Sequence, residues 1–321
     1  MFPEGLPLVR PSVPNAEDLG RDIRAIVESR ILTNGPFVRE LERRAEEYLG
    51  VAHCVAVASC TSGLMLVLRA SAVQGEVVVP SFTFMATAHA VVWNGLGVRF
   101  ADIDPVTLTL APASVRLALG TEVGAIIATH TYGTPCDVSG LNQVAREGGA
   151  RLFFDAAHAF GSRVQGQPVG RFGHGEVFSL SPTKVMVAGE GGLITTSDES
   201  FAETCRIGRD YGNAGDYDPR FVGLNARMSE LHAAFALRSL EGLEERIERR
   251  GDLAMLYRGA LAGLPGIFFP EVRPGDRSTY KDFTVIVDPD GFGLPARKFA
   301  DALRPEGIGV RRYYAPPLHR T

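Results

Sequence analysis

Short apolar runs alternate with longer amphipathic stretches over most of this chain. Apolar residues recur at helical spacing from Asn15 to Arg30 and from Phe37 to Tyr48, with turn residues between the two stretches. Strand-like runs and further helical stretches then alternate. The predicted strands are 53–58, 76–80, 98–101, 123–128, 151–154, 176–180 and 193–196, and the predicted helices between them are 61–72, 85–94, 112–119 and 139–147. Short strands that are apolar throughout are typical of a mostly parallel sheet with helices on both faces, so the pattern predicts an α/β fold.

After Thr196 the strands become sparse and the helical stretches become longer. The predicted elements are a helix over 198–209, a polar loop over 210–222, a long helical region over 228–261, a strand over 283–287, a helix over 296–303 and a strand over 310–314. These last elements predict a smaller α+β unit. We therefore expect a large domain over residues 1–235, which includes the N-terminal helical segment, and a smaller C-terminal domain over residues 236–321.

Composition and charge limit the classes of function. The 321 residues are 45% hydrophobic and 22% charged, as in ordinary globular proteins, and carry a formal net charge of −4. This charge gives no electrostatic support for binding nucleic acid or an anionic membrane. No apolar run reaches the roughly 18 residues of a membrane-spanning helix, and the Pro-rich start lacks the apolar segment of a secretory signal. Because Cys54, Cys60, Cys136 and Cys205 lack the spacing of a metal site or a disulfide framework, we expect a cytoplasmic protein without a metal.

One lysine directly follows a predicted buried strand. Lys184 comes after the run that ends at Leu180, and the Gly-rich turn Gly189–Gly192 leads into a strand that we expect to pair with the first as a hairpin. Burial lowers the pKa of a lysine, and the neutral amine condenses with aldehydes. Glycines let the backbone pass close to a bulky ligand. We interpret Lys184 as a Schiff-base lysine for pyridoxal 5′-phosphate (PLP); a solvated lysine at a strand end is the alternative.

Polar and aromatic residues follow two earlier strands, at the positions where ligands bind in α/β sheets. Thr61 and Ser62 start a predicted helix, whose free N–H groups and hydroxyls suit a phosphate. Helix capping is the alternative role of these residues. Phe82 and Phe84 follow the next strand. Phe84, which lies deeper in the turn, is the better candidate for stacking on a cofactor ring, and packing in the core is the alternative.

Asp155 directly follows the apolar strand 151–154. A buried carboxylate is costly unless it meets a positive partner, such as a protonated pyridine nitrogen. An anionic Asp155 would keep the ring of PLP protonated, so that the ring accepts electrons; helix capping is the alternative. We expect His158 near the same ring, and the hydroxyl of Ser179 near the phosphate. Asn225, in the later polar loop, is a candidate for reaching a ligand, and otherwise a capping residue.

These features, together with longer motifs, resemble the DegT/DnrJ/StrS-type sugar aminotransferases, which are PLP enzymes of fold type I. The motifs that carry the resemblance are Pro80–Thr87, His130–Gly133, Asp155–Gly161, Thr183–Lys184 with Gly189–Gly192, and Asn225–Glu230. The resemblance extends from Thr33 to His319, nearly the whole chain. It implies a large domain with a mostly parallel sheet, a smaller C-terminal domain, and a homodimer whose subunits share their active sites.

The resemblance also implies a role for each candidate residue. Lys184 would bind PLP covalently and move the proton during amino transfer. The roles implied for the others are pairing with the pyridine nitrogen (Asp155), contact with the cofactor (His158), phosphate binding (Thr61, Ser62, Ser179, and Asn225 from the neighbouring subunit), ring stacking (Phe84) and substrate binding (Tyr313, Tyr314). The implied reaction moves an amino group from glutamate or glutamine to a keto sugar, usually one carried on a nucleotide diphosphate.

The chain departs from the family pattern at Cys60, where Gly is usual, and at Phe154, where Glu is frequent. It also ends soon after the Pro317-Leu318-His319 segment, so we expect a truncated or unusually short C-terminal domain. Sugar dehydratases of the family carry His at the position of Lys184, which argues against that activity. A nucleotide-binding protein without PLP would need a G-x-G-x-x-G turn after the first strand, which is absent. A keto-cyclitol aminotransferase and a PLP-binding regulatory protein stay open as alternatives.

Overall fold

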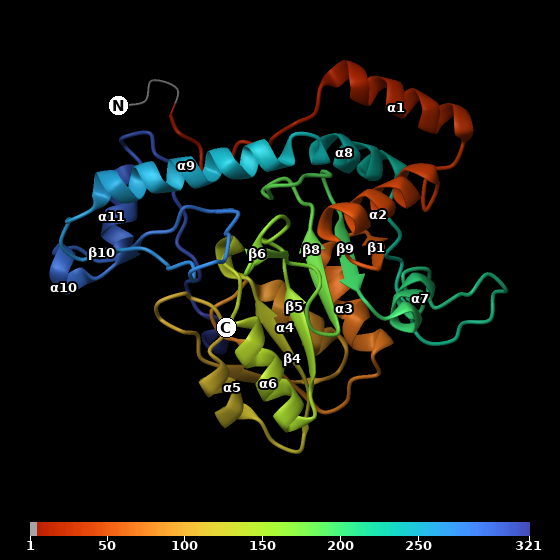
Figure 1. The fold of residues 1–321 in the computed structure, drawn as a ribbon, viewed down its shortest axis with the longest axis horizontal. Helices are drawn as coiled ribbons and strands as arrows, with labels where there is room; N and C mark the ends of the chain where they lie inside the picture. The colour runs from red at the N-terminus through yellow and green to blue at the C-terminus, as the bar shows by residue number, and fades with distance from the viewer. Residues whose placement is uncertain (1–4) are drawn as a thin grey trace.

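The computed structural model describes residues 5–321, and a seven-stranded sheet forms its centre (Figure 1). The strands are β1 (His53–Val57), β2 (Glu76–Pro80), β3 (Gly97–Ala101), β4 (Val123–Thr129), β5 (Arg151–Asp155), β8 (Gly175–Ser179) and β9 (Gly192–Thr196). Their order is β1-β9-β8-β5-β4-β2-β3, and only β9 runs antiparallel to its neighbours in this sheet of the described chain. The predicted mostly parallel sheet is therefore confirmed, as is the hairpin of β8 and β9.

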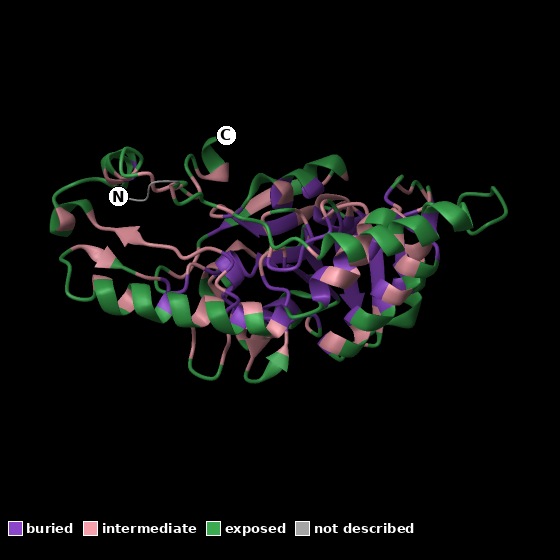
Figure 2. Ribbon diagram, turned by 90° about the horizontal axis from the view of Figure 1, so that it is seen from above, coloured by how far each residue is buried: buried purple, intermediate pink, exposed green. Residues whose placement is uncertain are grey.

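Helices cover both faces of the sheet because successive residues of each strand point to opposite sides. One face carries Val55, Val79 and Ile127, and the other carries Ala56 and Ile126. The covering helices are α3 (Cys60–Ala70), α4 (Met85–Trp93) and α7 (Glu199–Gly208) on the first face, and α2 (Pro36–Leu49), α5 (Pro112–Ala118), α6 (Val138–Gly148) and α8 (Glu230–Leu240) on the second. Figure 2 shows that the buried residues gather in this layered part of the molecule.

The N-terminal helices begin and end where the sequence predicts. Helix α1 (Ala16–Ser29) starts at Asn15, whose Oδ1 accepts hydrogen bonds from the N–H groups of Glu17 and Asp18 at 2.8 and 3.3 Å. Helix α2 ends at Gly50, which takes the left-handed conformation with a φ of 62°. Helix α1 lies outside α8 and away from the sheet (Figure 1).

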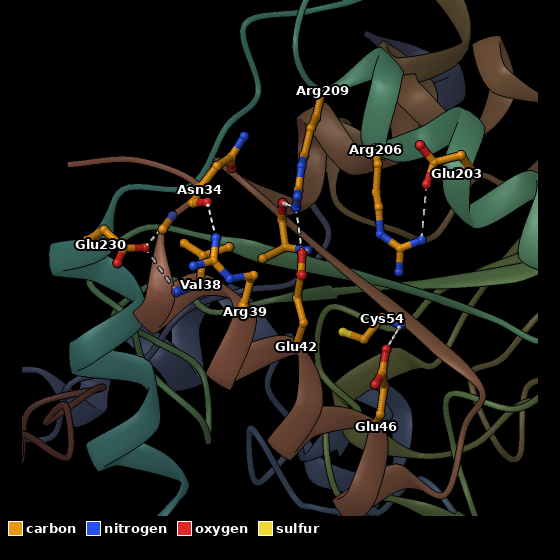
Figure 3. Close-up of polar contacts among 12 residues, drawn as sticks. Asn34, Val38, Arg39, Glu42, Glu46, Cys54, Glu203, Arg206, Arg209 and Glu230 are labelled. Atoms are coloured by element: carbon orange, nitrogen blue, oxygen red, sulfur yellow. Dashed lines mark hydrogen bonds and ion pairs between the residues drawn. The ribbon is translucent and has the colours of Figure 1, made fainter. Parts of the chain in front are cut away.

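Side chains of the chain itself occupy the outer edge of β1 (Figure 3). The N–H of Cys54 donates to Glu46 Oε1, and the N–H of Ala56 donates to Glu42 Oε1, both at 2.8 Å. Arg209 donates to Glu42 Oε1 at 2.6 Å and to the carbonyl of Ala56 at 2.7 Å. The N–H of Ala58 continues the row by donating to the carbonyl of Ala226 at 2.8 Å. Helix α2 and two loops thus satisfy polar groups that an edge strand normally exposes.

A buried carboxylate joins the start of α2 to the start of α8. Glu230, which is 1% exposed, accepts hydrogen bonds from the N–H groups of Gly35, Phe37 and Val38 at 2.9, 2.9 and 3.0 Å (Figure 3). The first N–H groups of a helix have no partner within it, and the helix dipole favours a negative charge there. Glu230 therefore caps a helix that is distant from it in sequence.

Two expectations about the second half of the chain need correction. The long helical region is two helices, α8 and α9 (Leu243–Leu261), because Gly242 takes a left-handed conformation with a φ of 64°. Residues 310–314 do not form a strand. They have no partner strand, and the nearest ladder contact is a single bridge between Ile308 and Leu6. Two residues of this segment, Tyr313 and Tyr314, line a cavity instead of entering a sheet.

The C-terminal elements are short and less buried. They are β10 (Ile267–Phe268), β11 (Ile286–Val287), α10 (Pro289–Phe292), α11 (Ala296–Leu303) and the 3₁₀ turn Leu318–Arg320. Earlier in the chain are three other short elements: the 3₁₀ turn Thr131–Gly133 and the paired strands β6 (Arg163–Val164) and β7 (Gln167–Pro168). The helix predicted over 296–303 is confirmed, whereas the strand predicted over 283–287 keeps only its last two residues. The domain boundary at residue 235 stays a prediction. Among the described helices, none combines the length and the apolarity that a bilayer crossing requires.

Candidate active site

A cavity of about 320 Å³ opens at the carboxyl ends of the sheet strands. Residues that end or follow β1, β2, β4, β5 and β8 line it, as expected for the ligand site of an α/β sheet. The cavity contains eight of the ten residues that the sequence singles out: Thr61, Phe84, Asp155, His158, Ser179, Lys184, Tyr313 and Tyr314. The other two, Ser62 and Asn225, do not line it.

Lys184 lies in the turn after β8, and its N–H donates to the carbonyl of Ser181 at 3.0 Å. Gly192 lets β9 pass against the start of α3, since a Cβ there would lie 2.7 Å from the backbone nitrogen of Cys60. Burial, and after it the like charge of Lys281, lowers the pKa of Lys184 below its ordinary value. The site therefore favours the neutral amine, which is the form that attacks an aldehyde.

Asp155 ends β5 and is almost fully buried, with 3% of its surface exposed. Its Oδ2 accepts from the hydroxyl of Thr87 at 2.7 Å, and its Oδ1 accepts from the N–H of Ala157 at 3.1 Å. Burial raises the pKa of Asp155, and these two hydrogen bonds oppose part of the rise. A cationic group in the cavity would restore the charge of this carboxyl, so the site is suited to one.

Three buried threonines form a hydroxyl chain that ends on Asp155. Thr83 Oγ1 lies 2.9 Å from Thr87 Oγ1 and 3.0 Å from Thr129 Oγ1. Each hydroxyl has one hydrogen to donate. When Asp155 is ionised it can only accept, so Thr87 donates to Asp155, Thr83 donates to Thr87, and Thr129 donates to Thr83. The chain therefore has one direction, and it holds the carboxylate ready for a cation.

His158 and the tyrosines form an aromatic wall of the cavity. The N–H of Tyr132 donates to His158 Nδ1 at 3.1 Å, which leaves the hydrogen of the neutral imidazole on Nε2. Burial, with the ammonium groups of Lys184 and Lys281, lowers the pKa of His158 well below its ordinary value. The ring of Tyr132 stacks on His158 at 6.3 Å and on Tyr314 at 6.2 Å between centroids. A neutral histidine thus lies beside the lysine.

Hydroxyl groups from the turns after β1 and β8 also line the cavity, and they belong to Ser59, Thr61, Ser179 and Ser181. Thr61 lies in the first turn of α3, where backbone N–H groups are free to bind an anion. The N–H of Ser62 donates to Ser59 Oγ, and the hydroxyl of Ser62 accepts from the N–H of Ser59, each at 3.1 Å. This reciprocal pair is a capping box, the alternative role considered for this turn.

The comparison with known proteins identifies the family. A model of the DegT/DnrJ/EryC1/StrS aminotransferase family matches residues 15–321. The chain belongs to this family. The prediction of a PLP-dependent aminotransferase of fold type I is therefore confirmed.

This aminotransferase is similar to several characterised proteins. It is 32% identical over 322 residues to dTDP-4-amino-4,6-dideoxy-D-glucose transaminase of Escherichia coli. This match covers 98% of this chain and 86% of that protein. It is 37% identical over 307 residues to the erythromycin biosynthesis sensory transduction protein EryC1 of Saccharopolyspora erythraea. This match covers 94% of this chain and 82% of EryC1. The crystal structure of DesI in the presence of its TDP-sugar product has a TM-score of 0.95 and 37% identity, and the match covers 99% of this chain and 82% of that one. Most of these names agree with the predicted transfer to a nucleotide-linked keto sugar.

The side chains of this aminotransferase fit PLP. A buried carboxyl (Asp155) is suited to a protonated ring nitrogen, and an amine with a lowered pKa (Lys184) is suited to the aldehyde. The hydroxyls of Thr61 and Ser179 and the start of α3 provide donors for a phosphate. Phe84 lines the same cavity and offers an aromatic face.

Sequence reasoning missed five residues of this site, among them Thr129 at the end of β4. Thr83 and Thr87 lie within the family-like motif Pro80–Thr87, and their polar side chains in an otherwise apolar helix start were the available signal. Lys281 and Arg311 also line the cavity, and no local pattern marks them. Asn225, by contrast, lies outside the cavity, where Asp210 forms a β-bridge with it and Arg227 donates to its side chain at 3.4 Å.

Proposed function

We propose that this aminotransferase moves an amino group from glutamate or glutamine to a keto sugar carried on a nucleoside diphosphate. The observation that carries the proposal is the placement of Lys184 and the buried Asp155 in one cavity at the carboxyl ends of the strands. The similarity to DesI, whose crystals were studied with a TDP-sugar product, supports a nucleotide-linked sugar as the acceptor. The name of the E. coli relative supports the same class of acceptor.

PLP supplies an aldehyde that exchanges amine for carbonyl and a ring that accepts electrons. Lys184 Nζ, favoured in its neutral form, takes the proton from the α-carbon of the amino donor and later delivers a proton to the sugar carbon that receives the amine. Asp155 would hold a proton on the ring nitrogen, and the threonine chain keeps its carboxylate oriented. The neutral His158 contributes a hydrogen-bond donor without adding positive charge beside Lys184.

We further propose a cytoplasmic homodimer in which Asn225 serves the cofactor site of the neighbouring subunit. Its position outside the cavity of its own chain supports this role, because a residue that serves a partner's site cannot occupy its own. The free, buried state of Cys54, Cys60, Cys136 and Cys205 is compatible with a reducing compartment. The experiment that tests the dimer is the mass in solution, together with the activity regained when Lys184→Ala and Asn225→Ala subunits are mixed.

The test of the proposed function is the absorption spectrum of the purified protein with PLP, recorded before and after glutamate and then glutamine. We expect a yellow cofactor band that glutamate or glutamine removes and that a keto-sugar nucleotide then restores. Restoration by a keto-cyclitol alone would assign the acceptor to that other class. A yellow band that no amino donor removes would contradict the proposal and favour a regulatory role, which the name of EryC1 raises. In the matched control, Lys184→Ala, PLP should bind without covalent attachment and without turnover.

A further inference from the structure

A second lysine lines the cavity that contains Lys184, and the reaction as described does not use it. The Lys281 side chain is 3% exposed, and its Nζ donates to both carboxylate oxygens of Asp282, at 3.0 and 2.8 Å. An ammonium group has three hydrogens to donate, so these two bonds leave one for another acceptor. A buried ammonium is costly to keep in a fold, which makes its presence inside a substrate cavity informative.

The backbone holds Lys281 against the aromatic wall of the site. Its N–H donates to the carbonyl of Tyr132 at 3.0 Å, and Arg250 donates to its carbonyl at 3.2 Å. Two residues earlier, the hydroxyl of Thr279 donates to the carbonyl of His158 at 2.7 Å. The segment is thus fixed to Tyr132 and to His158, and His158 lines the same cavity as Lys184. The positive charge of Lys281 lowers the pKa of both Lys184 and His158, secondary to burial, which agrees with close placement.

The cavity contains another cation, Arg311, which differs from Lys281 in depth. Both lie over the ring of Tyr313, at 5.8 Å for Lys281 Nζ and 5.7 Å for the Arg311 guanidinium carbon. Arg311 is exposed, whereas Lys281 is buried. The cavity therefore has an inner ammonium near Lys184 and an outer guanidinium nearer to solvent.

The two substrates carry their negative charges at different distances from the reacting carbon. In an amino-acid donor, a carboxylate is bonded directly to the α-carbon from which Lys184 takes the proton. In a sugar nucleotide, the diphosphate is bonded to the anomeric carbon, so the sugar ring separates it from the keto carbon. An ammonium close to Lys184 therefore matches the carboxylate, and a cation at the opening matches the diphosphate.

We propose that Lys281 is the substrate-binding residue that holds the α-carboxylate of the amino donor during the first half of the reaction. This inference rests on the proposed function, because it requires an amino-acid donor. Asp282 positions the ammonium, and the hydrogen that Asp282 leaves free is the donor to the substrate.

The experiment measures the first half-reaction of the PLP-loaded protein with glutamate alone, without an acceptor. In Lys281→Met, we expect the apparent Kd for glutamate to rise by roughly 10- to 100-fold, which corresponds to about 1.4 to 2.8 kcal/mol at 1.4 kcal/mol per factor of ten. The Kd for α-methylglutamate, which has no α-proton to transfer, should rise by a similar factor, while the KM for the sugar nucleotide stays within about twofold. Lys281→Arg should recover part of the affinity because it keeps the charge.

Two further variants separate recognition from folding. Lys281→Met leaves the partly buried Asp282 without its partner, so Lys281→Met/Asp282→Asn removes both charges. We expect the same loss of glutamate affinity with normal PLP loading. Arg311→Met is the matched control: it removes the other cation near Tyr313 and should leave the Kd for glutamate within about twofold.

The outcomes distinguish this inference from the proposed function. If the wild-type protein reacts with glutamate and the Lys281 variants bind it equally well, the inference is overturned and the proposed function stands. A loss limited to the sugar nucleotide would also overturn it and would assign Lys281 to the diphosphate. If the wild-type protein reacts with neither glutamate nor glutamine, both proposals fail together.

Discussion

Replacing Thr87 by valine should weaken PLP binding without touching the cofactor. Valine has nearly the shape of threonine but lacks the hydroxyl that donates to Asp155 Oδ2 at 2.7 Å. Hydrogen bonds to charged groups contribute about 1.5 to 3 kcal/mol. Asp155 would then keep the hydrogen bond from the N–H of Ala157 and a weak one from the Cys60 thiol at 3.9 Å, both to Oδ1, and would have no donor on Oδ2. We therefore expect its ionised form to lose an amount in this range.

This loss has two measurable consequences. The pKa of Asp155, which burial already raises, should rise further because the hydroxyl that favours its ionised form is gone. The Kd for PLP near neutral pH should rise by roughly 10- to 100-fold, since binding needs the ionised carboxylate. In a titration of PLP affinity against pH, the acidic limb should move to higher pH.

The sign of the stability effect follows from the same shift. A carboxyl whose pKa is raised by folding binds more protons in the folded state than in the unfolded state, so the PLP-free protein loses stability as the pH rises through that pKa. Thr87→Val should widen this loss, and Thr87→Ser, which keeps a hydroxyl, should reduce it toward the wild-type value. Equilibrium dialysis of PLP over a range of pH is the assay. Equal Kd values and equal acidic limbs for wild type and Thr87→Val would refute the reasoning.

Three other predictions follow from separate parts of the structure. Glu42→Ala should lower the free energy of unfolding in urea by about 3 to 5 kcal/mol because it leaves Arg209 buried without its partner. In the control, replacement of the exposed Glu40 by alanine should change this free energy by at most about 0.5 kcal/mol. Equal effects of the two substitutions would contradict the role of the β1 edge. Ser62→Ala should lower the free energy of unfolding by about 0.5 to 2 kcal/mol through loss of the capping box and leave the Kd for PLP within about twofold. Thr61→Ala, by contrast, should weaken PLP binding. A large loss of PLP affinity in Ser62→Ala would show instead that this hydroxyl binds the phosphate. In stopped-flow absorbance, the rate at which the PLP-free protein binds PLP should rise with pH through the lowered pKa of Lys184. Lys281→Met removes a like charge, so its curve of rate against pH should lie at higher pH than that of the wild type. Identical curves would show that the two amines do not interact.

The sheet could be predicted from sequence because each strand carries its own signal. All seven predicted strands agree with the structure to within one residue at each end, since apolar runs bounded by turn residues are local features. The cavity could be predicted for a related reason: polar residues directly after parallel strands must meet at one edge of the sheet. The sequence alone therefore predicts that Thr61, Asp155 and Lys184 lie together, and all three line the cavity.

What could not be predicted depends on contacts between distant segments. The Thr83–Thr129 hydrogen bond joins residues 46 positions apart, and Lys281 reaches the cavity only because Thr279 and Arg250 fix its segment there. The strand expected over 310–314 failed because strand formation needs a partner, which the local pattern does not contain. The division of α8 from α9 depends on one left-handed glycine, Gly242, within a strongly helical sequence.

The occupied edge of β1 has a consequence for assembly. Three successive outward N–H groups, those of Cys54, Ala56 and Ala58, already donate to acceptors of the same chain. A strand from another molecule would have to displace the buried carboxylate of Glu42 and its guanidinium partner before it could pair there. Two copies of this protein therefore cannot merge their sheets into one continuous sheet through β1. The same contacts keep partly unfolded neighbours from using this edge as a template for aggregation.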